Sequence, residues 1–143
     1  MAGVDEAVRL PEWPGRTVGV LATVSDDGPH AIPISAPVRA GDRRILFSLH
    51  RTRDSLARLR QRPQVALAVL TEGNVAFTAR GRARVLEEPM AVDPDYAAVE
   101  VDVDAVDDHR QPGFEVTAGV DRNWHDPAER DALGTRVGAL RER

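Results

Sequence analysis

Hydrophobic residues along the chain recur mostly at every second position, in short runs that end at turn-forming residues. Because the side chains of a strand point alternately to its two faces, this pattern predicts strands with one buried face. The predicted strands cover residues 17–25, 29–39, 43–50, 64–70, 75–88, 96–109 and 114–120. The tripeptides DDG, AGD and EGN, at residues 26–28, 40–42 and 72–74, are typical of tight turns. The pattern therefore predicts an antiparallel sheet built largely from hairpins.

Two of the predicted strands carry charge on one face. Within residues 75–88, small and apolar residues alternate with arginines, which are Arg80, Arg82 and Arg84. Within residues 96–109, valines alternate with acidic residues, which are Glu100, Asp102 and Asp104. We expect the valines to face the core, the arginines to face solvent or a partner, and the carboxylates to form a solvent face.

A helical pattern separates the third and fourth predicted strands. Leu56 and Leu59 are three positions apart and lie on one face of such a helix, and Pro63 ends the pattern. The candidate N-cap residues are Thr52, Asp54 and Ser55.

A second helix is predicted at the C-terminus. Asp126 is the expected N-cap, Pro127 occupies the first helical position, and Glu129 follows the cap by three residues. The apolar residues that share one face are Leu133, Val137 and Leu140. We expect this face to pack on the barrel or on a second subunit.

Together these elements predict a mainly β, α+β fold. Strands joined by hairpins, with one helix after the third strand and one at the C-terminus, are typical of a closed or partly closed antiparallel β-barrel. The length of 143 residues predicts a single domain over residues 1–143.

Composition narrows the classes of function. The chain has no cysteine, which excludes disulfides and thiolate chemistry. It also has no lysine, since the nineteen lysine and arginine residues are all arginine, and this excludes a Schiff base and a phosphate-loop lysine. The net charge of −4 argues against nucleic-acid binding. The longest aliphatic run is VALAVL and no secretory signal is visible, so we expect a cytoplasmic protein without a membrane span.

No metal site or hydrolase site is predicted. The four histidines, His30, His50, His109 and His125, are too scattered in the sequence to suggest a ligand set. The aspartates Asp102, Asp104, Asp107 and Asp108 resemble a calcium site only superficially, because strand alternation places Asp102 and Asp104 on a solvent face. No G-x-S-x-G elbow occurs, and Ser35, His30 and the aspartates do not make a convincing triad.

Arg51 and Arg53 stand at the start of the first predicted helix, which is the positive end of its dipole. Arginines there are disfavoured by about 0.3–1 kcal/mol each unless a negative group compensates them. A bound phosphate is one such group, because free helical amides and guanidinium groups both bind it. Alternatively, Asp54 neutralises one arginine and both are solvated charges.

The order of the segments VGVLATVSDDGPHAIPIS, RILFSLHRTRDSLARLRQRPQVALAVL and VAFTARGRARVLEE resembles the pyridoxamine 5′-phosphate oxidase-like split β-barrel flavoproteins, including their flavin and deazaflavin oxidoreductases. The resemblance covers residues 13–90. It implies a split antiparallel β-barrel and a homodimer that binds FMN or a deazaflavin in grooves between the subunits. It also implies a small-molecule substrate and no catalytic side chain, because hydride moves to or from the ring of the cofactor.

The resemblance also assigns cofactor-binding residues. Pro33, Ile34 and Ser35 match the strand beside the isoalloxazine ring. The end of the next strand and the helix start match the phosphate site, with the residues Ser48, Leu49, His50, Arg51, Arg53, Ser55 and Arg58. His50 either touches the phosphate or lies on the surface. Members of the family commonly have a lysine near this helix start, for which Arg51 or Arg58 is the expected substitute here.

Two functions remain open from the sequence. One is an FMN-dependent or deazaflavin-dependent oxidoreductase that transfers hydride to or from a small molecule. The alternative is a non-catalytic binding protein on the same fold, holding flavin, haem or another anionic ligand. Trp124 either stacks on a cofactor from the second subunit or packs before the Asp126 cap.

Overall fold

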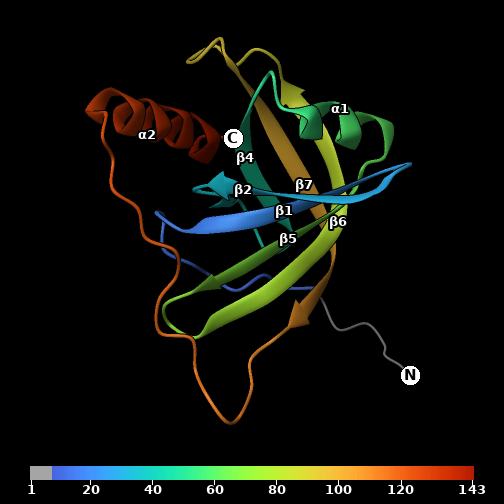
Figure 1. Cartoon of the computed structure of the whole chain (residues 1–143), viewed down its shortest axis with the longest axis vertical. Helices are drawn as coiled ribbons and strands as arrows, with labels where there is room; N and C mark the ends of the chain where they lie inside the picture. The colour runs from blue at the N-terminus through green and yellow to red at the C-terminus, as the bar shows by residue number, and fades with distance from the viewer. Residues whose placement is uncertain (1–7) are drawn as a thin grey trace.

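A curled antiparallel sheet of seven strands forms the body of the protein, in a computed structural model that describes residues 8–143, and two helices lie at one end of the sheet (Figure 1). In chain order the elements are β1 (Val18–Ser25), β2 (Gly28–Ser35), β3 (Val38–Arg39), β4 (Arg44–His50), α1 (Asp54–Gln61), β5 (Gln64–Thr71), β6 (Val75–Glu87), β7 (Tyr96–Asp108) and α2 (Pro127–Arg141). The predicted mainly β barrel with one inserted and one C-terminal helix is confirmed.

The strands lie in the order β2-β1-β5-β6-β7-β4-β3, and every neighbouring pair is antiparallel. The predicted continuous strand over residues 29–39 is wrong, because the chain turns at Ala36 and divides it into β2 and β3. Ala36 has a φ of 51°, in the left-handed region that costs an L-residue about 1–2 kcal/mol. At this corner the chain crosses from one edge of the sheet to the other, which curls the sheet into a barrel.

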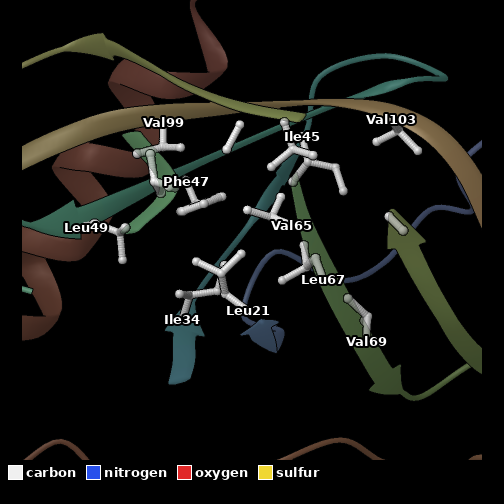
Figure 2. Packing of buried hydrophobic residues seen from close by; sticks show 14 of the residues in the cluster. Leu21, Ile34, Ile45, Phe47, Leu49, Val65, Leu67, Val69, Val99 and Val103 are labelled. Atoms are coloured by element: carbon white, nitrogen blue, oxygen red, sulfur yellow. The ribbon is translucent and has the colours of Figure 1, made fainter. Parts of the chain in front are cut away.

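The interior of the barrel is a continuous apolar core (Figure 2). Its side chains come from the alternating positions of the strands, and Phe47, Leu67 and Val99 have no solvent exposure. Leu56 and Leu59 of α1 join the same cluster, as their spacing predicted. Burying one such side chain stabilises the fold by about 1.5–3 kcal/mol relative to leaving it exposed.

Strand β6 bends where its register with β7 shifts, between Arg80 and Gly81. A Cβ atom at Gly81 would lie 2.1 Å from the carbonyl oxygen of Asp102, so the close approach of the two backbones requires glycine here. The arginines on either side of this bend face solvent, as the alternation predicted.

Glu100 departs from the predicted acidic solvent face. Its exposed fraction is 8%, because Arg44 of β4 and Arg84 of β6 fold over it and both donate hydrogen bonds to its carboxylate. Burial raises the pKa of Glu100, but the two arginine hydrogen bonds outweigh burial and leave the pKa below its usual value of 4.5. Asp102 and Asp104 on the same strand are exposed, as predicted.

The predicted strand over residues 114–120 is wrong: Phe114 makes one isolated bridge to Gln111, and residues 115–120 have no regular structure. One pair of hydrogen bonds joins this stretch to the barrel: the Asn74 N–H donates to the Val116 carbonyl, and the Val116 N–H donates to Asn74 Oδ1. Phe114 and Val120 remain exposed, so the stretch has too little burial to hold it in a sheet. The structure has seven strands, the number that the sequence predicted. The seventh is β3 rather than a strand over residues 114–120.

The two helices begin differently. In α2 the Asp126 side chain accepts a hydrogen bond from the Ala128 N–H, 2.9 Å away, and Pro127 is the first helical residue, both as predicted. In α1 the predicted caps are wrong. The N-cap position is Arg53, which makes no side-chain capping bond, and Asp54 and Ser55 are already helical.

Candidate functional site

A small cavity of about 110 Å³ lies where the two edges of the curled sheet approach each other. Strands β2 and β4 supply most of its walls, the start of α1 and the start of β7 close one end, and α2 lies across it. The lining residues are Pro33, Ile34, Ser35, Ser48, Leu49, His50, Arg53, Tyr96, Leu133 and Arg136. Seven of the ten residues that the resemblance assigned to the cofactor therefore surround one cavity.

The strand edges around this cavity have no neighbouring strand on one side. Strand β3 pairs with β4 at Ile45 and Leu46, so within residues 8–143 no strand lies beside Ser48–His50 on that side. Strand β2 pairs with β1 on one side and is the edge of the sheet on the other. An edge strand presents unpaired N–H and C=O groups. Such groups can hold the polar rim of a planar ring.

His50 is held in place at one end of the cavity. The Thr52 N–H donates to its Nδ1 at 3.2 Å, and the ring packs edge-on against Tyr96 with centroids 5.1 Å apart. Because Nδ1 accepts this bond, the proton of the neutral ring lies on Nε2. His50 therefore lines the cavity with its ring held by Thr52 and Tyr96, and its predicted contact with a phosphate stays a prediction.

Arg53 and Arg51, the two arginines at the start of α1, have different surroundings. Arg53 lines the cavity, and its exposed side chain makes no hydrogen bond or ion pair with the described residues 8–143. Arg51 points to the other side, where its Nε donates to Glu88 at 3.2 Å and its Nη1 donates to the Pro94 carbonyl at 3.4 Å. The negative group beside Arg51 is therefore a carboxylate of the protein itself.

Glu88 binds two arginines, because Arg60 also donates to its carboxylate. The hydrogen bonds from Arg60 and Arg51 lower the pKa of Glu88, so it is ionised at neutral pH. Sequence reasoning missed this pairing because Glu88 lies 37 residues from Arg51, beyond the end of β6.

Ser55 and Arg58 do not line the cavity. Arg58 Nε donates to the buried Thr23 hydroxyl at 2.9 Å, and its Nη2 donates to Ser55 Oγ at 3.0 Å. The bond to Thr23 fastens α1 to β1, and the bond to Ser55 lies within α1. Arg58 therefore holds the helix whose first residues face the cavity.

Three residues at the cavity were not anticipated: Tyr96, Leu133 and Arg136. Arg136 is buried, with an exposed fraction of 6%, and its Nε donates to Ser48 Oγ at 3.1 Å. A signal for it was present in the sequence, since Arg136 lies three residues after Leu133 and four before Leu140, on the apolar face of α2. An arginine in such a stripe is either paired with a carboxylate or directed into a site.

Arg122, which precedes α2, also reaches the site. Its Nη1 donates to Ser35 Oγ at 3.1 Å, and its guanidinium lies 4.7 Å from the centre of the Trp124 ring. Trp124 is exposed and is a neighbour of Arg122 here; its predicted contact with a second subunit stays a prediction.

The other candidate clusters do not form sites. Residues 8–143 contain no group of three or more histidine, aspartate or glutamate residues placed to hold a metal ion. At the β1–β2 turn, Ser25 and Asp27 both bond to the same atom, Nε2 of His30. The bonds from Ser25 and His30 lower the pKa of Asp27 to about 2. A triad needs the carboxylate on the opposite ring nitrogen, so this is a turn-stabilising network.

The cavity fits one part of a flavin nucleotide and not the other. Arginine and hydroxyl groups are the donors that bind a phosphate group, and Arg53 and Ser48 supply them. The volume of about 110 Å³ is well below the roughly 300 Å³ at which small-molecule pockets begin. An isoalloxazine ring does not fit while α2 lies where it does.

Comparison with known proteins identifies the family. The sequence model of pyridoxamine 5′-phosphate oxidase matches residues 5–110. The search of curated proteins gives no match. No helix within residues 8–143 is both long enough and apolar enough to cross a membrane.

Solved structures share the fold at low sequence identity. An F420 reductase is 20% identical with a TM-score of 0.54, over 66% of this chain and 91% of its own. General stress protein 26 from Bacillus anthracis is 19% identical with a TM-score of 0.52, over 64% and 83%. An FAD-binding protein from Mesorhizobium loti is 17% identical with a TM-score of 0.52, over 63% and 83%. With most of its length matched by the family model, the chain belongs to the pyridoxamine 5′-phosphate oxidase family.

Proposed function

We propose that this protein is an oxidoreductase that uses FMN, or alternatively a deazaflavin, to transfer hydride to or from a small molecule. The observation that carries the proposal is the gathering of Arg53, Ser48 and the open edges of β2 and β4 around one cavity. Family membership and the likeness to structures described as an F420 reductase and an FAD-binding protein support the same class of cofactor.

The roles of the residues follow from their positions. Arg53 and the Ser48 hydroxyl would hold the phosphate, and the backbone of Pro33–Ser35 would lie beside the ring. The cofactor itself accepts or donates the hydride, so the protein has to supply orientation and exclusion of water rather than a reacting side chain. Arg53 would provide the main charge for phosphate binding, because Arg51 is already paired with Glu88.

We also propose a homodimer. The outer face of β1 exposes Val20 and Val24, and an apolar groove of about 340 Å³ lies beside Val24 and Val65. Exposed apolar patches on a small protein mark contact surfaces, and a second copy of the same chain is the commonest partner. Sedimentation at micromolar concentration is expected to give a dimer.

The alternative is a non-catalytic protein that binds flavin, haem or another anion. The pairing of Arg51 with Glu88 favours it, because it leaves the phosphate position with fewer free cations than the sequence suggested. The absence of lysine from α1 also favours the non-catalytic alternative.

Absorption spectra and titrations separate these functions. Purified protein would be titrated with FMN, with a deazaflavin and with riboflavin, and the bound forms tested for reduction and reoxidation by a small-molecule donor and acceptor. We expect FMN to bind more tightly than riboflavin, which lacks the phosphate, and to turn over. Binding without turnover would support the non-catalytic alternative, and equal binding of FMN and riboflavin would contradict the phosphate site.

A further inference from the structure

The part of the chain that lies across the cavity is outside the family match. The match ends at residue 110, and the C-terminal segment, residues 111–143, runs from the end of β7 along the outside of the barrel to α2 at the opposite end (Figure 1). Its side-chain hydrogen bonds to the predicted site run from Arg122 to Ser35 and from Arg136 to Ser48, both at 3.1 Å. The segment thus binds the hydroxyl groups of two residues that the resemblance assigned to the cofactor site.

Arg136 is satisfied without a ligand. Its Nη1 donates to Asp93 Oδ2 at 2.9 Å, and its guanidinium carbon lies 3.6 Å from the centre of the Tyr96 ring. The ion pair and the stacking on Tyr96 neutralise and cover the charge. Arg136 therefore acts here as an anchor for α2, and no bound anion is needed to explain its burial.

The anchoring of α2 is local. Leu140 packs in a small cluster with Val38, Leu46 and Met90, separate from the main core. Leu133 lines the cavity, and most other side chains of the helix are exposed. Residues 115–125 before the helix have almost no regular structure. Because the main core includes no residue of α2, the helix can leave without opening the barrel.

The size of the cavity limits the ligand that it can hold while α2 is in place. About 110 Å³ is enough for an anionic group but not for a tricyclic ring. Since Leu133 and Arg136 form one wall, moving α2 away joins the cavity to solvent between the β2 and β4 edges. We propose that α2 is a displaceable cover, anchored by Arg136 and Arg122, that competes with the flavin for this site. The proposal rests on the proposed function for the identity of the ligand.

The test compares full-length variants in FMN titrations followed by fluorescence. Arg136→Gln removes the anchor on Ser48 and Asp93, and Arg122→Gln removes the one on Ser35. Because a closed cover lowers apparent affinity by the fraction of open molecules, we expect Arg136→Gln to tighten FMN binding by about tenfold or more and Arg122→Gln by about threefold. Loss of a positive charge alone would weaken binding of an anion, so the expected sign separates the cover from simple electrostatics.

Arg130→Gln is the matched control. Arg130 is exposed in the first half of α2 and pairs with Asp131 of the same helix, so its loss changes the charge equally without releasing the cover. We expect less than a twofold change in FMN affinity. Should Arg136→Gln fail to fold, Arg122→Gln, which alters a residue outside any helix or strand, still tests the prediction.

Hydrogen exchange gives a readout independent of turnover. In the wild-type protein, saturating FMN should reduce protection of the amides of residues 133–140, while the β5 and β6 amides stay protected. Weaker FMN binding by Arg136→Gln, or greater protection of α2 with FMN, would show that Arg136 binds the ligand and would overturn the cover. If wild type binds FMN and Arg136→Gln binds it equally, only the cover fails. If neither the wild type nor any variant binds FMN or a deazaflavin, both the cover and the proposed function fail.

Discussion

The barrel buries Phe47 and Leu67 completely, whereas the C-terminal segment leaves Phe114 and Val120 with exposed fractions of 61% and 68%. The barrel is held by continuous backbone ladders between antiparallel strands and by one apolar core. The C-terminal segment is held by a few hydrogen bonds, most of them donated by arginine side chains, and by the packing of Leu140. This difference indicates that the two regions have separate stabilities, and that the site between them can open while the barrel stays folded.

The largest effect is expected in the barrel core. Phe47→Ala should lower the free energy of unfolding by about 3–5 kcal/mol, because it removes a fully buried ring from the cluster in Figure 2 and leaves a cavity. Urea unfolding followed by circular dichroism measures it. Phe114→Ala in the C-terminal segment is the control, and we expect no measurable change. Similar losses in the two variants would contradict the difference between the regions.

A smaller and local effect is expected at the base of α2. Leu140→Ala should weaken docking of the helix by about 2–3 kcal/mol, since Leu140 is buried against Val38 and Leu46. Hydrogen exchange should show lost protection in α2 with unchanged protection in β5 and β6. If the barrel amides lose protection together with α2, the two regions unfold as one unit and the separate stabilities are refuted.

A substitution of Arg53 tests the barrel side of the cavity. Charge-assisted hydrogen bonds contribute about 1.5–3 kcal/mol, so Arg53→Ala should weaken FMN binding by roughly ten- to a hundredfold. Arg136→Gln, on the opposite wall, is expected to change affinity in the other direction. Arg53→Ala should cost little folding stability, because the Arg53 side chain has no partner within residues 8–143.

Arg60→Ala serves as the control for this prediction. Arg60 lies at the far end of α1 and donates to Glu88, away from the cavity. We expect almost unchanged FMN affinity. Equal titration curves for the Arg53 and Arg60 variants would mean that the start of α1 is not an anion site.

The smallest effect is expected where the end of the chain meets the barrel. Arg44 donates both to the Glu100 carboxylate and, through Nη1 at 3.0 Å, to the carbonyl of Arg143. Glu100→Gln should lower the free energy of unfolding by about 1–2 kcal/mol at neutral pH, because two charge-assisted hydrogen bonds become weaker.

The pH dependence of this effect has a definite sign. The folded-state pKa of Glu100 lies below its usual value of 4.5, so its contribution to stability is present above pH 4.5 and is lost as pH falls through the folded pKa. Unfolding measured from pH 7 downward should show the wild type and Glu100→Gln converging at acid pH. A constant difference at all pH values would exclude ionised Glu100 as the source.

Local patterns predicted most elements because they carry their own physical signal. Alternation located the strands, Asp126 and Pro127 located the start of α2, and Leu56 and Leu59 identified the buried face of α1. The predicted strand over residues 114–120 failed because alternation describes a strand only when a neighbouring strand is available to pair with it. The division of residues 29–39 was missed because the crossing at Ala36 depends on where the two sheet edges lie.

The sequence by itself determined most of the strands, both helices, and the buried valines and leucines, which follow from periodicity and turn chemistry acting over a few positions of the chain. The stretches that line the cavity were assigned by the resemblance of the sequence to the family. The tertiary structure decided the partners of the charges: Glu88 for Arg51, Arg44 and Arg84 for Glu100, and Asp93 and Ser48 for Arg136. Charge pairing depends on distance in space, and these partners lie 16 to 88 residues apart in the chain. Strand pairing brings Arg44 and Arg84 to Glu100, and the docking of α2 brings Arg136 to Asp93 and Ser48.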